Sequence, residues 1–116
     1  MPGMSIHAVD IARGAAATGL RVSVERLEGD RRIFVAEGAI AANGNLEAKA
    51  LETTLPRGVY EVTFLVGDYV RQHDGSSARI FLDRAPFRFA IDDPALHCHL
   101  PFKFTAFGFS CFRGEA

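Results

Sequence analysis

Short runs of β-branched and aromatic residues, separated by turn signals, recur along the chain and restrict its fold more than any other feature. The strongest run is residues 59–66, which is rich in Val, Tyr, Thr and Phe. Residues 20–27 alternate between apolar and polar, with one slip near the end of the run. Further strands are expected at residues 33–41, from about residue 46, and at residues 87–91, 99–104 and 107–112. Roughly seven or eight short strands at this spacing predict an all-β sandwich.

Two connections carry more specific predictions. Asn43-Gly44 is the dipeptide best suited to a tight type I′ turn, in which both central residues have positive φ, so a strand should restart near Leu46. Residues 68–78 are the most polar connection. They predict either a loop or one short helix followed by a loop.

Length and charge limit the organisation and the partners. With 116 residues, of which 48% are hydrophobic, residues 1–116 are expected to form a single domain. Thirteen basic residues against fourteen acidic ones give no field that would attract nucleic acid or an anionic membrane. We expect neither partner. No basic stretch followed by an apolar run opens the chain, and no segment approaches the ~20 apolar residues of a membrane span, so a cytoplasmic protein is expected.

Histidines are the first candidates for chemistry. His97 and His99 are two residues apart and would share one face of a strand, where two imidazoles could bind a metal or a substrate. H-x-H also occurs by chance in solvated strand-edge loops, and this interpretation is favoured for the motif taken alone. His7, between Ile6 and Ala8, is by itself more simply explained as a satisfied core histidine.

Other catalytic and cofactor motifs are absent from the sequence. It contains no G-x-S-x-G nucleophile motif, phosphate loop, dinucleotide fingerprint or cysteine zinc cage. Cys98 and Cys111 are expected to be reduced and packed, and a Cys–His hydrolase built on Cys98 is poorly supported. We therefore expect no cofactor and no required metal.

Several motifs, in the same order along nearly the whole chain, resemble those of transthyretin-like proteins. They are Ile6-His7-Ala8-Val9-Asp10 with the following Arg13-Gly14, then Gly67-Asp68-Tyr69, His97-Cys98-His99-Leu100-Pro101, Phe107-Gly108-Phe109-Ser110 and Phe112-Arg113-Gly114. The resemblance implies two stacked four-stranded sheets with a short helix after Tyr69. It also implies a homotetramer whose dimer–dimer interface encloses a channel.

The histidines place the resemblance in the 5-hydroxyisourate hydrolase branch rather than among the hormone carriers, which lack histidines at the positions of His7 and His99. In that branch the two histidines, a hairpin arginine and a C-terminal tetrapeptide surround the substrate. His7, His99 and Arg113 match the family pattern. The hairpin arginine falls on Asn45, and the tyrosine and serine of the tetrapeptide fall on Phe112 and Glu115, with Ala116 added beyond.

These departures weaken the expected stabilisation of negative charge, because Asn45 offers one neutral amide where a guanidinium offers a fork of donors. Phe112 lacks a hydroxyl donor. Lys103 could compensate, since it shares strand parity with His99 and replaces an apolar residue of the family pattern. A solvated strand residue is an equally good interpretation of Lys103.

The resemblance predicts a hydrolase that opens a cyclic amide of the 5-hydroxyisourate type in purine degradation. One neutral imidazole, of His7 or His99, would take a proton from water, while Asn45, Lys103 or Arg113 would hold negative charge on oxygen. Two alternatives stay open: a diverged small-molecule binding module, and an enzyme of the same fold with another substrate. The tetramer is expected also because a monomer would expose the C-terminal aromatic residues, namely Phe102, Phe104, Phe107, Phe109 and Phe112.

Overall fold

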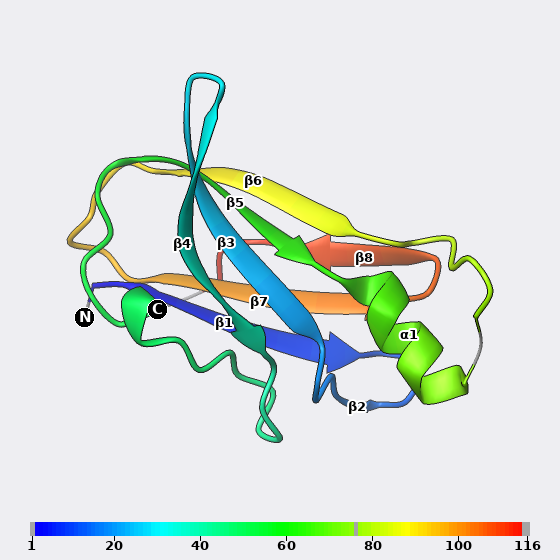
Figure 1. Cartoon of the computed structure of the whole chain (residues 1–116). Coiled ribbons are helices and arrows are strands. Elements are labelled where there is room, and N and C mark those ends of the chain that lie inside the picture. Colours follow the sequence, from blue (N-terminus) through cyan, green and yellow to red (C-terminus); the bar gives the residue numbers. More distant parts are fainter. Residues whose placement is uncertain (1, 76, 115–116) are drawn as a thin grey trace.

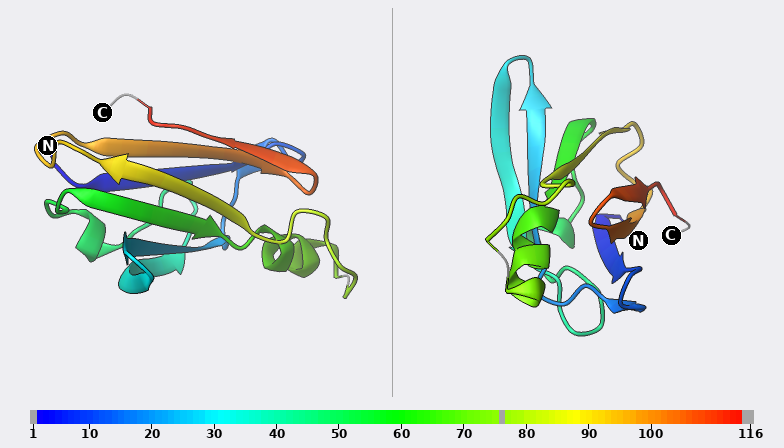
Figure 2. Two further views of the ribbon diagram at one scale, coloured as in Figure 1. Left: turned by 90° about the horizontal axis from the view of Figure 1, so that it is seen from above. Right: turned by 90° about the vertical axis from the view of Figure 1, so that its right-hand side faces the viewer.

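Two four-stranded sheets pack face to face in the computed structural model, which describes residues 2–75 and 77–114 (Figure 1). The first sheet has the order β2-β1-β7-β8 and the second the order β4-β3-β5-β6. The two layers are seen from above in Figure 2. The predicted transthyretin-like sandwich is therefore confirmed. The strands are β1 (Met4–Asp10), β2 (Ala15–Ala16), β3 (Arg21–Glu28), β4 (Arg31–Ala39), β5 (Gly58–Phe64), β6 (Ala85–Ile91), β7 (Cys98–Thr105) and β8 (Gly108–Cys111).

The first sheet joins the two ends of the chain. β1 runs parallel to β7 and pairs with it from Met4↔Cys98 to Asp10↔Phe104. β8 returns antiparallel along the other side of β7, and Gly114 forms an isolated bridge with His99. The start of β1, the start of β7 and the segment after β8 consequently meet at one end of the sandwich.

The second sheet is built around the β3–β4 hairpin, which projects beyond the sandwich in Figure 1. The pairing of β3 with β4 shifts register between Val24 and Glu25, as a β-bulge does. The extra residue is Val35 of β4, while β3 keeps an unbroken register with β5 from Val22 to Leu27. The bulge therefore belongs to β4 and does not explain the slip in alternation near the end of β3.

The core lies between the sheets and is mainly aromatic. Tyr60, Phe64, Phe102 and Phe104 are all at most 1% exposed, and the rings of Phe64 and Phe102 stack with centroids 3.7 Å apart. Phe102 and Phe104 therefore do not belong to an exposed aromatic patch. In β7 the even-numbered residues point inward, so only Phe107, Phe109 and Phe112 of the predicted group are exposed.

One helix, α1 (Val66–Asp74), closes the end of the sandwich beside β2 (Figure 1). The Tyr69 hydroxyl donates to the buried Asp10 carboxylate at 2.9 Å, and the backbone N–H of Arg13 donates to the same carboxylate at 3.2 Å. Asp10 thus ties the end of β1 to the helix. The helix confirms the second of the two predictions for residues 68–78.

Three local predictions were wrong. The run 59–66 divides into β5 and the first residue of α1 instead of forming one strand. No strand forms at Leu46, where the described chain makes only the isolated bridges His7↔Asn45 and Ile40↔Leu46 before the short 3-10 helix η1 (Lys49–Leu51). The turn has positive φ at Gly44 alone, with the Gly44 N–H bonded to Ala41 and the Ala41 N–H to Asn45, so it is a three-residue connection rather than type I′.

Within the described residues, no helix is both long and apolar enough to span a membrane. Cys98 and Cys111 are both free thiols, and burial raises the pKa of each, that of Cys111 to about 12. Two thiols held protonated in this way are poor nucleophiles, which opposes a Cys–His hydrolase.

Candidate active site

The outer face of the first sheet carries the candidate residues at the end where β1 and β7 both begin. Residues alternate in both strands, so Ser5 and His7 in β1 and His99 in β7 point away from the core and are half-buried. The parallel register places Ser5 opposite His99 and His7 opposite Pro101. The sheet thereby brings together two parts of the sequence more than 90 residues apart.

Ser5 links two histidines. Its Oγ lies 2.6 Å from Nδ1 of His99 and 2.8 Å from Nε2 of His97, which immediately precedes β7. Both distances are those of good hydrogen bonds. His97, Ser5 and His99 form a continuous polar chain across the start of the sheet, which we call the Ser5 bridge.

His7 is held against the turn that follows β4. A Cβ added to Gly44 would lie 2.4 Å from Nε2 of His7, so the imidazole packs directly on the glycine backbone. Gly44 has φ +88°, and its carbonyl accepts a hydrogen bond from the Ala8 N–H. The next residue, Asn45, is exposed and bridges to His7. The turn thus supplies both the support of His7 and a neutral amide beside it.

A cavity of about 360 Å³ opens at this end of the sheet. Its polar lining comes from Ser5, Asn45, His97 and His99, with Glu52 at one side. Apolar side chains complete the wall, which is the usual composition of a small-molecule site. The remaining lining residues are Pro2, Met4, Leu46, Ala48 and Leu51.

His99 is electrostatically set to be neutral. Burial lowers its pKa, and charge on His97 or on His7 would lower it further, while a hydrogen bond with the backbone of Ser5 acts in the opposite direction. Because an unperturbed histidine has a pKa of about 6.5, a lowered pKa leaves His99 uncharged at neutral pH. In the register of β1 with β7, His7 and His99 lie on the same face of the sheet in neighbouring strands, because His7 is opposite Pro101 and His99 is opposite Ser5.

Arg113 takes a different position from the two histidines. It lines a second cavity, of about 280 Å³, together with Cys98, Leu100 and the aromatic residues Phe87 and Phe89 of β6. His97 lines both cavities. Arg113 is therefore a neighbour of the Ser5 bridge on the side away from His7 and does not line the cavity of His99 and Asn45.

Lys103 and Phe112, the other two predicted binding residues, also lie outside the lining of that cavity. Lys103 is exposed on the same outer face, opposite Val9 of β1 and Ser110 of β8. Phe112 is 46% exposed just after β8. Glu115 and Ala116 lie outside the described residues.

Sequence reasoning did not place Ser5 in the site and left His97 as a solvated residue. The available signals were strand parity, which puts Ser5 on the face of His7, and the H-x-H spacing, which puts His97 on the face of His99. The register between β1 and β7 was needed to connect them. Among residues 2–75 and 77–114, no three His, Cys, Asp or Glu side chains are grouped so as to hold a metal ion.

The chain is similar to known proteins over nearly its whole length. The 5-hydroxyisourate hydrolase of Deinococcus radiodurans is 37% identical over 115 residues, covering 98% of this chain and 97% of the relative. The structure of Klebsiella pneumoniae 5-hydroxyisourate hydrolase is 31% identical with a TM-score of 0.80, covering 99% of this chain and 100% of that one.

A thyroxine-bound sea bream transthyretin shares the fold, with a TM-score of 0.83 at 22% identity over 98% of this chain and 96% of its own. Residues 4–114 match the model described as the HIUase/Transthyretin family. That match spans both sheets and both histidines of the outer face, and the chain belongs to this family.

Proposed function

We propose that the protein hydrolyses 5-hydroxyisourate, opening a cyclic amide in purine degradation. The observation that carries the proposal is the pair of half-buried imidazoles, His7 and His99, on one sheet face. His99 lines a cavity together with Asn45, and His7 does not line it but bridges to Asn45. Relatives that carry the name 5-hydroxyisourate hydrolase match almost the full length of the chain, which supports the same activity here.

The chemistry requires a base for water and a donor for the carbonyl oxygen. The oxygen of water bonds to the carbonyl carbon, the ring C–N bond breaks, and the departing nitrogen takes a proton. A neutral imidazole, of His7 or His99, can accept the proton that water loses. The second imidazole and the Asn45 amide are positioned to donate to the oxygen that gains negative charge.

Asn45 supports one alternative, an enzyme of the same family acting on a different cyclic amide. A neutral amide binds an oxyanion less strongly than the arginine of the family pattern, and it can accept as well as donate a hydrogen bond. A substrate that offers a donor at this position would then be preferred. The binding-module alternative gains no comparable support, because a carrier has no need of two histidines that are both hydrogen-bonded to Ser5.

The proposal includes a homotetramer, in which outer faces of the first sheet from different subunits would enclose the cavity. Three exposed aromatic residues at the end of the chain, Phe107, Phe109 and Phe112, support burial of that region by another copy. A cytoplasmic location stays a prediction.

The test is a rate measurement with freshly generated 5-hydroxyisourate, followed by the loss of its ultraviolet absorbance against the spontaneous reaction. Purified protein should accelerate the decay in proportion to its concentration, and His7→Ala and His99→Ala should each remove most of the acceleration. His73→Gln, on α1, is the matched control, because its ring bonds to the Tyr69 carbonyl at 3.0 Å in a different part of the molecule. Acceleration that survives both site substitutions would overturn the proposal.

A further inference from the structure

The Ser5 bridge contains one hydroxyl proton between two ring nitrogens. Ser5 Oγ lies 2.8 Å from Nε2 of His97 and 2.6 Å from Nδ1 of His99. A hydroxyl donates one hydrogen bond and accepts others. With both imidazoles neutral, both bonds are made only if one of the two facing nitrogens carries a proton and the other does not.

Two arrangements satisfy this condition, and they give His99 opposite properties. In the first, His97 Nε2–H donates to Ser5, whose hydroxyl donates to bare Nδ1 of His99, so the His99 proton is on Nε2. In the second, His99 Nδ1–H donates to Ser5, which donates to bare Nε2 of His97. Then Nε2 of His99 is bare, and His97 carries its proton on Nδ1.

The second ring nitrogen of His97, Nδ1, decides between the two arrangements. Its Nδ1 is buried and has no hydrogen-bond partner among the described residues. The second arrangement would place an N–H at that atom and leave a buried donor unpaired, whereas the first leaves only a lone pair there. Unpaired buried N–H groups are the rarer and costlier case, so the first arrangement is the more stable.

We propose that Ser5 and His97 are positioning residues that hold the proton of neutral His99 on Nε2, so that His99 acts as a hydrogen-bond donor to the carbonyl oxygen of the substrate. This rests on the proposed hydrolase function and deepens it. His99 already uses Nδ1 as an acceptor toward Ser5, so it presents N–H, and not a lone pair, at its other nitrogen. The role of base for water then belongs to His7.

The surrounding charges are compatible with a neutral His99. His7 lies on the same face, and His97 adjoins through Ser5; charge on either one disfavours protonation of His99. Glu52 lines the same cavity, and Arg113 lines the cavity on the other side of His97. Among the described residues, no Asp, Glu, Lys or Arg side chain is hydrogen-bonded to the side chains of the Ser5 bridge, so the hydroxyl proton controls the tautomer.

Nitrogen-15 NMR of the protein labelled at histidine reads the tautomer directly, whether or not the protein turns over substrate. Signals are assigned with His99→Gln and His97→Gln. The expected result above pH 7 is His99 protonated at Nε2 and His97 also protonated at Nε2. A His99 signal that shows N–H at Nδ1 would overturn the proposal, even if hydrolysis is confirmed.

Variants of Ser5 test whether its hydroxyl fixes the tautomer of His99. Ser5→Ala should give a mixture of His99 tautomers and lower kcat by roughly 10- to 100-fold, within the range for losing one oxyanion donor, with a smaller change in KM. Ser5→Thr, which keeps the hydroxyl on a strand-compatible side chain, should restore the single tautomer and most of the rate. Ser23→Ala in β3 controls for removing a half-buried serine from a strand. An unchanged tautomer in Ser5→Ala would overturn the role assigned to Ser5.

Discussion

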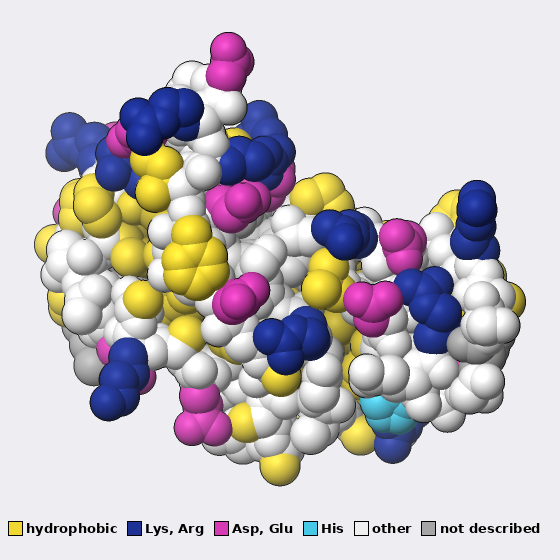
Figure 3. Space-filling model, viewed as in Figure 1, with side chains coloured by type: hydrophobic (Ala, Val, Ile, Leu, Met, Phe, Trp, Pro, Cys, Tyr) yellow, Lys and Arg dark blue, Asp and Glu magenta, His cyan; other side chains and the backbone are white. Residues whose placement is uncertain are grey.

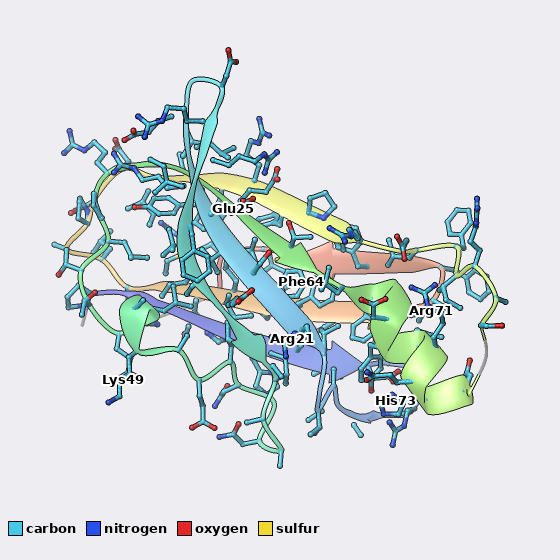
Figure 4. All side chains as sticks on the ribbon, viewed as in Figure 1. Arg21, Glu25, Lys49, Phe64, Arg71 and His73 are labelled. Carbon is cyan, nitrogen blue, oxygen red and sulfur yellow. The ribbon has the colours of Figure 1, made fainter. Side chains whose placement is uncertain are left out.

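Both sheets carry polar side chains on their outer faces, but these side chains are paired in different ways. On the second sheet, Glu61 of β5 accepts from Arg32 at 2.8 Å and from Arg88 at 3.2 Å, and Arg32 also bonds to Glu25 at 2.9 Å. Glu25 is labelled on β3 in Figure 4, and oppositely charged side chains lie next to one another around the β3–β4 hairpin in Figure 3. On the first sheet, the Ser5 bridge joins one hydroxyl to two imidazoles by hydrogen bonds.

The difference separates a structural face from a reactive one. Glu25, Arg32, Glu61 and Arg88 form ion pairs with one another, and we call them the Glu61 cluster. In this cluster the arginines lower the pKa of the Glu61 carboxyl. In the Ser5 bridge each His99 nitrogen has a different role, one bonded to the protein and one free for a ligand. Substitutions in the cluster should therefore change stability, and substitutions around the bridge should change rate.

The largest effect on rate is expected from His99→Ala. It removes a group that contacts substrate in the proposed site, and such groups contribute roughly 100- to 10,000-fold to rate. We expect a loss in that range in kcat/KM, measured with fresh 5-hydroxyisourate at matched subunit concentration. The urea midpoint should change little, because the side chain is half-buried on the outer face. A large fall in stability with an unchanged rate would reverse the distinction between the faces.

Gly44→Ala should have the next largest effect, about 100-fold on kcat, because a displacement of order 1 Å at a reacting group can cost that much. The new methyl group would meet Nε2 of His7 at 2.4 Å and push the imidazole away.

Gly19→Ala is a matched control for Gly44→Ala, since Gly19 has φ +92° and nothing within 4 Å of an added Cβ. Both variants should lose about 1 kcal/mol from the strained backbone, measured by urea unfolding. Only Gly44→Ala should lose rate. Equal rates in the two variants would show that His7 does not need its present position.

Local patterns in the sequence were enough for most of the fold, whereas the candidate site residues His7 and His99 came from the family resemblance. Alternation in β6 and β7 is set by neighbouring residues, so it was visible in the chain. The Ser5 bridge was not, because Ser5 and His99 are 94 residues apart and meet only through the β1–β7 register. The burial of Phe102 was also missed, because the aromatic run was considered as one patch without separating the two faces of the strand.

A smaller effect is expected from Glu61→Gln, this time on stability. The pKa of Glu61 is lowered, chiefly by its hydrogen bond with Arg32, so its ionised form stabilises the fold above the unfolded pKa of about 4.3, and this contribution is lost as pH falls through the folded pKa. We expect a cost of about 1 kcal/mol at pH 7, since the arginine partners are largely exposed. Urea unfolding at pH 7 and pH 3 measures it, and the difference between wild type and variant should shrink at pH 3. If the difference in unfolding free energy is the same at pH 7 and pH 3, or if Glu61→Gln slows hydrolysis, the structural role assigned to the outer face of the second sheet is contradicted.

The smallest effect is expected from Lys103→Leu. This variant tests whether Lys103 replaces the arginine that the family pattern has at the position of Asn45. Lys103 lies four residues beyond His99 along β7, roughly 13 Å at the rise of a strand, and it does not line the cavity of Ser5 and Asn45. A rate change below about twofold is expected, because removing a true oxyanion donor would cost ~100-fold or more. Asn45→Arg is the matched comparison, since it places a guanidinium at the cavity itself and should raise the rate. If Lys103→Leu instead lowers kcat more than tenfold while Asn45→Arg has no effect, charge reaches the substrate from Lys103, and the oxyanion site must be built across the face of more than one subunit.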